Sequence, residues 1–131
     1  YAPLIQKADY ELDWTRSAIA LHNQVRGFYP NCFTPFRGDI LKVMATIPLA
    51  DHYWDELPPE YRSLQPDTMA WPQTTAQPGE VVAIAKGLGA VVKTGAGLLL
   101  LKEVQLAGKR PQSGIDFANG TRLLPGERFH S

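Results

Sequence analysis

The feature that most constrains the fold is an apolar stretch, Leu98–Leu106, which is preceded and followed by glycine-containing turns. Its first four residues are all leucine, so both faces of a strand here are apolar, as is typical of a strand buried on both sides. The alternation breaks at Lys102, and we expect a β-bulge or a sheet edge near that residue. Two short apolar runs, 80–85 and 90–93, precede this strand and are separated by glycine turns. The pattern predicts a three-stranded antiparallel meander.

A second strand pair is expected at residues 33–47, with Arg37-Gly38-Asp39 as its turn. The same tripeptide matches a short integrin-type motif, but motifs this short occur often by chance and a hairpin turn is the preferred interpretation. The second strand of this hairpin alternates, and Lys42 lies on the face opposite its apolar residues. Short strands and frequent glycine turns predict a mainly β fold, a small closed or nearly closed barrel of five or six antiparallel strands.

Two helices are expected beside this barrel. Residues 13–28 have Asp13 as a candidate N-cap and an apolar stripe at helical spacing, so we expect this helix to pack against the barrel. Its stripe comprises Trp14, Ala18, Leu21, Val25 and Phe28. A shorter helix follows Ser113, a favourable N-cap with Asp116 three residues later, and is expected to stop at Gly120.

Residues 48–78 form a segment rich in proline and large aromatic side chains. Its prolines preclude a long regular element, whereas its aromatics argue against a free tail. We expect an ordered excursion, with a helical turn near 51–56, that packs on the domain. Stacking on exposed nucleic-acid bases is the alternative role for its aromatics, which are Tyr53, Trp54, Tyr61 and Trp71.

Charge and reactive side chains give little sign of catalysis. The formal net charge is zero, but residues 1–78 carry six Lys or Arg against nine Asp or Glu, and residues 79–131 carry seven against four. This asymmetry mildly favours an anionic partner for the second half. Three histidines, at 22, 52 and 130, have no metal-ligand spacing, and the single Cys32 excludes an internal disulfide. No signal-peptide pattern or membrane-length apolar run is present.

Several motifs resemble methionyl-tRNA formyltransferases. The run Glu103–Ser113, followed by Asp116–Gly120, Arg122-Leu123 and Pro125-Gly126, resembles the C-terminal end of that family. Two other segments agree in order and spacing. The first, which resembles the family's linker, has Tyr1-Ala2-Pro3, Lys7 and Asp13-Trp14; the second, which resembles the first helix of its C-terminal domain, has His22–Gly27 and Pro30.

The resemblance implies an interdomain linker at residues 1–12 and an OB-like C-terminal tRNA-binding domain at 13–131. Because Tyr1 is not an initiator Met, we expect the chain to be part of a longer protein. The family's Asn-His-Asp active site and folate pocket lie in a separate N-terminal Rossmann-like domain. The resemblance therefore implies no catalytic residue and no cofactor or metal in this chain, which we expect to be inactive alone.

The implied activity of the parent enzyme is formyl transfer from 10-formyltetrahydrofolate to initiator methionyl-tRNA, in the cytoplasm. The expected partners of this domain are the catalytic domain and the tRNA phosphate backbone, with no membrane or DNA partner. Seven cations are candidate phosphate contacts: Lys7, Lys42, Lys102, Lys109, Arg110, Arg122 and Arg128. Phosphate contacts position a nucleic acid without reading its sequence. For any one of these cations, the alternative is an ordinary solvated surface charge.

Two other functions fit the sequence. The chain could belong to a sibling enzyme, a 10-formyltetrahydrofolate hydrolase or dehydrogenase or a sugar N-formyltransferase, although the basic turn 107–110 favours the tRNA enzyme. It could also be a purely structural domain that only packs on its catalytic neighbour, which a net charge of zero permits.

Overall fold

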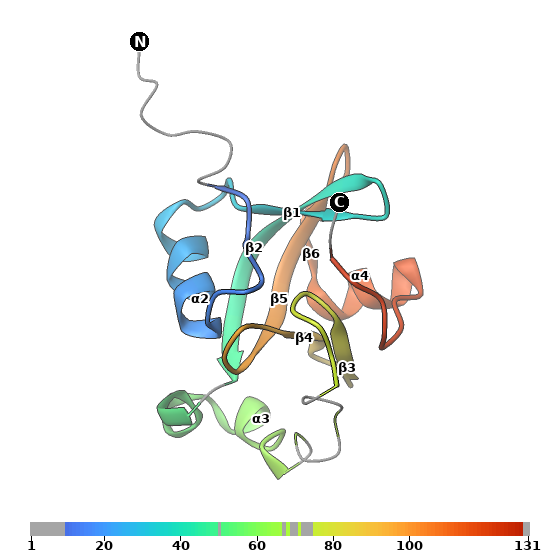
Figure 1. The fold of residues 1–131 in the computed structure, drawn as a ribbon. Helices are drawn as coiled ribbons and strands as arrows, with labels where there is room; N and C mark the ends of the chain where they lie inside the picture. Colours follow the sequence, from blue (N-terminus) through green and yellow to red (C-terminus); the bar gives the residue numbers. More distant parts are fainter. Residues whose placement is uncertain (1–9, 50, 67, 69–70, 72–74, 130–131) are drawn as a thin grey trace.

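The computed structural model describes residues 10–49, 51–66, 68, 71 and 75–129. Six antiparallel strands form one sheet that curls into a half-barrel (Figure 1). The sheet order is β1-β2-β5-β4-β3, and β6 pairs with β5 beside this path. The strands are β1 (Phe33–Phe36), β2 (Asp39–Leu49), β3 (Val81–Ala85), β4 (Gly89–Lys93), β5 (Leu98–Leu106) and β6 (Gln112–Ser113). The predicted mainly β architecture is confirmed, and β6 is the strand that the sequence did not indicate.

The β1–β2 hairpin turns at the predicted tripeptide. Phe36 pairs with Asp39, so the loop consists of two residues, Arg37 and Gly38. Both have positive φ, 50° and 80° respectively. Two successive residues with positive φ match the twist of a tight hairpin, which explains why glycine occupies one of the positions.

The β2–β5 pairing contains two compensating bulges. Met44 is skipped on β2 between the Val43–Val104 and Ala45–Glu103 pairs. Lys102 is then skipped on β5 before the Thr46–Leu101 pair. The irregularity expected at Lys102 is therefore a bulge. Each bulge adds twist to the strand pair, which helps the sheet to curl.

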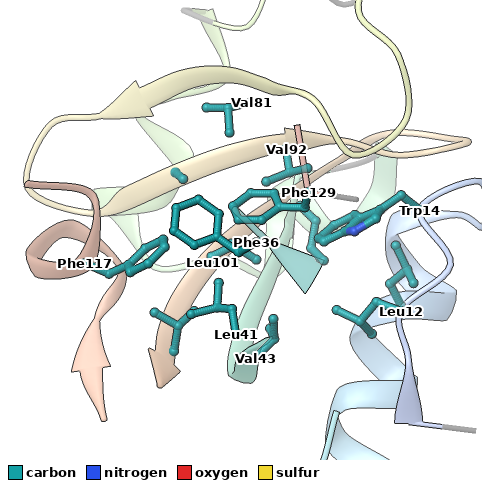
Figure 2. Close-up of a cluster of buried hydrophobic side chains, with 14 of the residues drawn as sticks. Leu12, Trp14, Phe36, Leu41, Val43, Val81, Val92, Leu101, Phe117 and Phe129 are labelled. Carbon is teal, nitrogen blue, oxygen red and sulfur yellow. The ribbon is translucent and has the colours of Figure 1, made fainter. Parts of the chain in front are cut away.

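The central strand β5 is buried on both faces, as its leucine run predicts. Leu99 and Leu101 belong to the apolar cluster inside the half-barrel. Figure 2 shows Leu101 there, together with Phe36, Phe117 and Phe129. Leu98 and Leu100 face the other side and belong to a second apolar cluster. The sheet thus separates two cores, one inside the half-barrel and one under the 51–66 segment.

The first described helix, α2 (Ala18–Gly27), begins later than the sequence suggested. Ser17, not Asp13, is its N-cap, and the Ser17 side chain accepts a hydrogen bond from the Ala20 amide. The Asp13 carboxylate instead closes a preceding turn by accepting two hydrogen bonds from Thr15. The prediction of a helix over 13–28 was therefore wrong at its start, because Asp13 satisfies local turn donors rather than helix donors. The predicted apolar face is correct: Ala18, Leu21 and Val25 are buried.

The proline- and aromatic-rich segment is ordered where the structure describes it. It contains the predicted turn, η1 (Asp51–Glu56), and a second helix, α3 (Pro59–Arg62), which begins with Pro59 in the first turn, where proline is tolerated. Trp54 and Tyr61 are only 7% exposed and pack on the outer face of the sheet. Burial, rather than display for base stacking, is their observed role.

The last helix, α4 (Gly114–Thr121), has the predicted N-cap, because Ser113 accepts a hydrogen bond from the Asp116 amide. It does not stop at Gly120. The left-handed cap residue is Arg122, with φ of 54°. Residues 123–129, which we call the C-terminal strap, then run back along the outer edge of β3. Three backbone hydrogen bonds of 2.7–2.8 Å join the strap to Gly79 and Val81.

Candidate nucleic-acid interface

The basic turn between β5 and β6 has a fixed backbone. The Lys109 amide donates to the Leu106 carbonyl at 3.0 Å, and the Gln105 side-chain amide donates to the Lys109 carbonyl at 2.8 Å. Gly108 supplies the positive φ, 75°, that the turn requires. The side chains of Lys109 and Arg110 are exposed. Local backbone bonds therefore present this cation pair to solvent from a defined position.

Lys42 lies at the same end of the sheet. It pairs directly with Gln105 across the β2–β5 ladder. A small hollow of about 130 Å³ links the two strands to the turn and is lined by Ile40, Lys42, Gln105, Leu106, Ala107 and Gly108. Lys42 and the basic turn thus border one continuous surface.

A larger groove opens on the other side of the turn. It holds about 340 Å³ and separates the β5–β6 turn from the last residues of α4. Its lining residues are Leu106, Lys109, Arg110, Gln112, Gly120 and Thr121. Arg122, the next residue along the chain, is exposed at the helix end. We call this hollow the basic-turn groove.

Arg37 is a further cation at this end, which the sequence indicates only as a hairpin-turn residue. Its guanidinium lies 4.8 Å from the centre of the Phe36 ring and donates two hydrogen bonds to Glu127. A third goes to the carbonyl oxygen of Thr121, at 2.9 Å. The Glu127 carboxylate raises the pKa of Arg37 through these hydrogen bonds. Only the distant pairing with Glu127 reveals this role, and no local sequence signal indicates it.

Four of the predicted cations therefore lie at one end of the half-barrel, on β2, in the β5–β6 turn and at the end of α4. Figure 1 shows the β1–β2 and β5–β6 turns in the upper part of the view, away from η1 and α3 at the bottom. These cations, Lys42, Lys109, Arg110 and Arg122, are all exposed.

The chain itself matches a known family over most of its length. Residues 4–122 match the formyl transferase C-terminal domain family. The chain belongs to this family. It is 62% identical over 127 residues to a methionyl-tRNA formyltransferase from Trichodesmium erythraeum, and 59% identical over 130 residues to one from Gloeothece citriformis. A third relative, the methionyl-tRNA formyltransferase of Synechocystis sp., is 44% identical over 122 residues.

These alignments cover 97%, 98% and 93% of the present chain, but only 38%, 39% and 37% of the respective relatives. The formyl transferase C-terminal domain thus spans less than two fifths of the length of the curated proteins it matches. The sibling enzymes considered above receive no support from these relatives.

The other predicted cations of this formyl transferase C-terminal domain lie elsewhere. Lys102 occupies the β5 bulge, in the middle of the strand, whereas the basic turn follows the end of the strand. Arg128 lies in the strap, where its Nε donates to the Pro78 carbonyl at 3.1 Å. Lys7 lies outside the described residues. The structure therefore does not bring all seven candidates to one place.

Two hollows near the start of α2, of about 430 and 680 Å³, exceed the basic-turn groove in volume. Glu11 and Asp13 line both of them. Hydrogen bonds from Thr15 hold the pKa of Asp13 below its ordinary value, so this carboxyl is negative at neutral pH. These carboxylates disfavour the binding of phosphate. Arg128 lines the smaller of the two hollows together with Glu11 and Asp13, so this cation lies in an unfavourable place for a phosphate contact.

In the described part of this domain, the surroundings of His22 and Cys32 suit a role in stabilising the fold rather than in catalysis. His22 shares a hydrogen bond of 2.9 Å with Thr46, and burial is the main cause of its lowered pKa. Burial also raises the pKa of the Cys32 thiol to about 11, which keeps it protonated at neutral pH. Within the described ranges, no group of three or more His, Cys, Asp or Glu side chains is arranged to hold a metal ion. None of the helices described there is long and apolar enough to cross a bilayer.

Proposed function

We propose that this chain is the tRNA-binding C-terminal domain of a methionyl-tRNA formyltransferase. The whole enzyme transfers a formyl group from 10-formyltetrahydrofolate to initiator methionyl-tRNA, and the part of the relatives that this chain does not match carries the chemistry. The half-barrel suits an OB-like domain, and the enzyme works in the cytoplasm, where its tRNA is found.

The observation that carries this proposal is the gathering of exposed cations around the rigid β5–β6 turn. Lys109 and Arg110 emerge from a backbone held by hydrogen bonds at 2.8 and 3.0 Å. A fixed cation pair loses less conformational entropy on meeting a phosphate than a mobile pair does. Lys42 and Arg122 extend the charged surface on either side. Cations in this arrangement suit the sugar-phosphate backbone of tRNA and supply affinity by releasing counterions.

The test is a salt titration of tRNA binding by wild type and by a Lys109→Ala/Arg110→Ala variant. Wild type should bind weakly, with Kd of roughly 10⁻⁴ to 10⁻⁶ M at physiological salt. The variant should bind initiator and elongator tRNAs more weakly by a similar factor, and the slope of log Kd against log salt should flatten by at most about two. Circular dichroism checks that the variant is folded, which we expect because exposed charges contribute little to stability.

A matched control removes the same charge elsewhere. Arg62 of α3 and Lys86 of the β3–β4 turn are both exposed and lie outside the groups that form the basic end. Arg62→Ala/Lys86→Ala should leave most of the affinity and salt slope intact. Equal losses in the two double variants would show that tRNA responds only to net charge, and an unchanged affinity in the first would place the RNA surface elsewhere. Absence of tRNA binding by wild type would favour the structural domain that only packs on its neighbour.

A further inference from the structure

The basic-turn groove has two walls of different chemistry. One wall is the β5–β6 turn, with the exposed cations Lys109 and Arg110. The other is the C-terminal end of α4, represented by Gly120 and Thr121. The carbonyl groups at a helix C-terminus carry partial negative charge and accept hydrogen bonds. An anion is therefore favoured at the first wall, whereas the acceptors of the second wall suit a hydrogen-bond donor.

Thr121 lines the groove, and its hydroxyl can act there as a hydrogen-bond acceptor. Its proton is donated to the carbonyl oxygen of Phe117, one helical turn earlier, at 2.8 Å. A hydroxyl oxygen whose proton is already engaged retains its lone pairs, so it can accept a further hydrogen bond. The neighbouring carbonyl of Thr121 accepts from Arg37, which fixes the backbone of the helix end. This second wall thus suits a neutral group that donates a hydrogen bond.

The remaining lining combines one apolar and one polar side chain, Leu106 and Gln112. The volume of about 340 Å³ is near the lower limit for small-molecule sites, which suits one sugar-phosphate unit and not a whole helix. A suitable occupant therefore carries an anion at one end, a hydrogen-bond donor at the other and carbon between them.

We propose that the basic-turn groove binds one ribose-phosphate unit of RNA and selects RNA over DNA. The phosphate contacts Lys109 and Arg110, and the ribose 2′-hydroxyl donates a hydrogen bond to Oγ1 of Thr121. The ribose carbons lie against Leu106. The 2′-hydroxyl is the group that distinguishes RNA from DNA at a single site. This inference rests on the proposed tRNA-binding function and adds the sugar chemistry that the groove recognises.

The test compares a short RNA stem-loop with the same sequence carrying 2′-fluoro ribose in place of every 2′-hydroxyl. The fluoro sugar keeps the A-form geometry and the phosphates but cannot donate a hydrogen bond. Wild type should bind the RNA more tightly by roughly threefold to tenfold, the range expected for one hydrogen bond. Thr121→Val, which keeps the side-chain shape but removes the acceptor, should reduce this preference to about onefold. Thr121→Ser retains a hydroxyl and should restore it.

Equal binding of the two stem-loops by wild type would overturn the inference, as would an unchanged preference in a folded Thr121→Val variant. The Lys109→Ala/Arg110→Ala variant separates the two proposals. If wild type binds both stem-loops equally and the double variant binds both more weakly, phosphate binding stands and ribose recognition fails. If wild type binds neither stem-loop, both proposals fail.

Discussion

Glu127 accepts two hydrogen bonds from the Arg37 guanidinium, at 2.9 and 2.7 Å, across 90 residues of sequence. This bidentate pair joins the β1–β2 turn to the C-terminal strap. The strap also carries Phe129, whose ring stacks on Trp14 and packs against Phe36 inside the half-barrel. In the sheet order, β1 and β3 are the two edge strands. The strap contacts both edges, because Glu127 binds the β1–β2 turn and the strap backbone bonds to Val81 of β3.

The ion pair predicts a specific loss of stability in acid. The hydrogen bonds from Arg37 are the main reason that the pKa of Glu127 lies below its ordinary value of 4.5. A carboxyl with a lowered folded-state pKa stabilises the fold above its unfolded-state pKa and loses that stabilisation as pH falls through the folded-state value. Both partners are partly exposed, so Glu127→Gln should cost only about 0–1 kcal/mol at pH 7.

Urea unfolding of wild type and Glu127→Gln between pH 7 and pH 3 measures this effect. The difference in free energy of unfolding should shrink as the pH falls below about 4.5, because protonation removes the wild-type ion pair. A difference that stays constant over this range would mean that the pair does not stabilise the fold.

Gly114 is required by close packing at the start of α4. A Cβ at this position would collide with the carbonyl group of Leu101 and approach Gly89. Backbone cannot move aside as a flexible side chain can, so Gly114→Ala should destabilise the domain by about 1–3 kcal/mol or more. Gly120→Ala is the matched control, because a Cβ there meets nothing within 4 Å. It should be neutral or slightly stabilising by thermal unfolding, since alanine favours helix over glycine. Similar melting temperatures for the two variants would contradict this packing argument.

The sequence predicted the sheet well because its signals are local. Alternating apolar residues and glycine turns located β3, β4 and β5 to within one residue at each end, and the irregularity at Lys102 marked the bulge. The N-cap role of Ser113 was also predicted from a local pattern, because its side chain bonds to Asp116, three positions away. Local patterns of this kind decide element type before any tertiary contact is considered.

The features that escaped prediction depend on a choice between competing local partners or on partners far away in the sequence. Asp13 resembles an N-cap, but Thr15 engages it in a turn, and the helix begins after Ser17. Arg37 became part of the candidate site only through Glu127 and Thr121, which lie in the last part of the chain. For the candidate cations, sequence named the residue types but not which of them share a surface. That information lies in the β2–β5 register and in the groove beside α4.

The outer apolar cluster predicts that the 51–66 segment stabilises the sheet. Trp54 is 7% exposed and belongs to an apolar cluster with Leu57 and Leu64, which flank α3, and with leucines of β5. Trp54→Ala should lower the free energy of unfolding by about 3–5 kcal/mol, as is typical of large aromatic truncations in a core. Tyr29→Ala, at a side chain that is 59% exposed, should change it by less than about 0.5 kcal/mol. Chemical denaturation measures both, and a mild effect of Trp54→Ala would show that this segment only rests on the sheet.

The last prediction concerns the C-terminal strap, which lies beyond the family match at residues 4–122. A chain that ends at Arg122 lacks two buried side chains, Leu123 and Phe129, which are 4% and 2% exposed. It also leaves β3 without its hydrogen bonds to Gly126 and Glu127. Removal of the Phe129 ring uncovers Trp14 and Phe36.

Each buried apolar side chain contributes about 1.5–3 kcal/mol, so the chain ending at Arg122 should lose several kcal/mol of stability. A chain ending at Phe129 is the control and should match the full chain, because it keeps every described strap contact. Phe129→Leu in the full chain gives a milder change, since a leucine fills part of the space but cannot stack on the indole of Trp14. Thermal and urea unfolding of these three proteins can be followed by tryptophan fluorescence. The chain ending at Phe129 should be the most stable, the Phe129→Leu variant intermediate, and the chain ending at Arg122 the least stable. Equal stability of the two truncated chains would show that the half-barrel does not need the strap to complete its core.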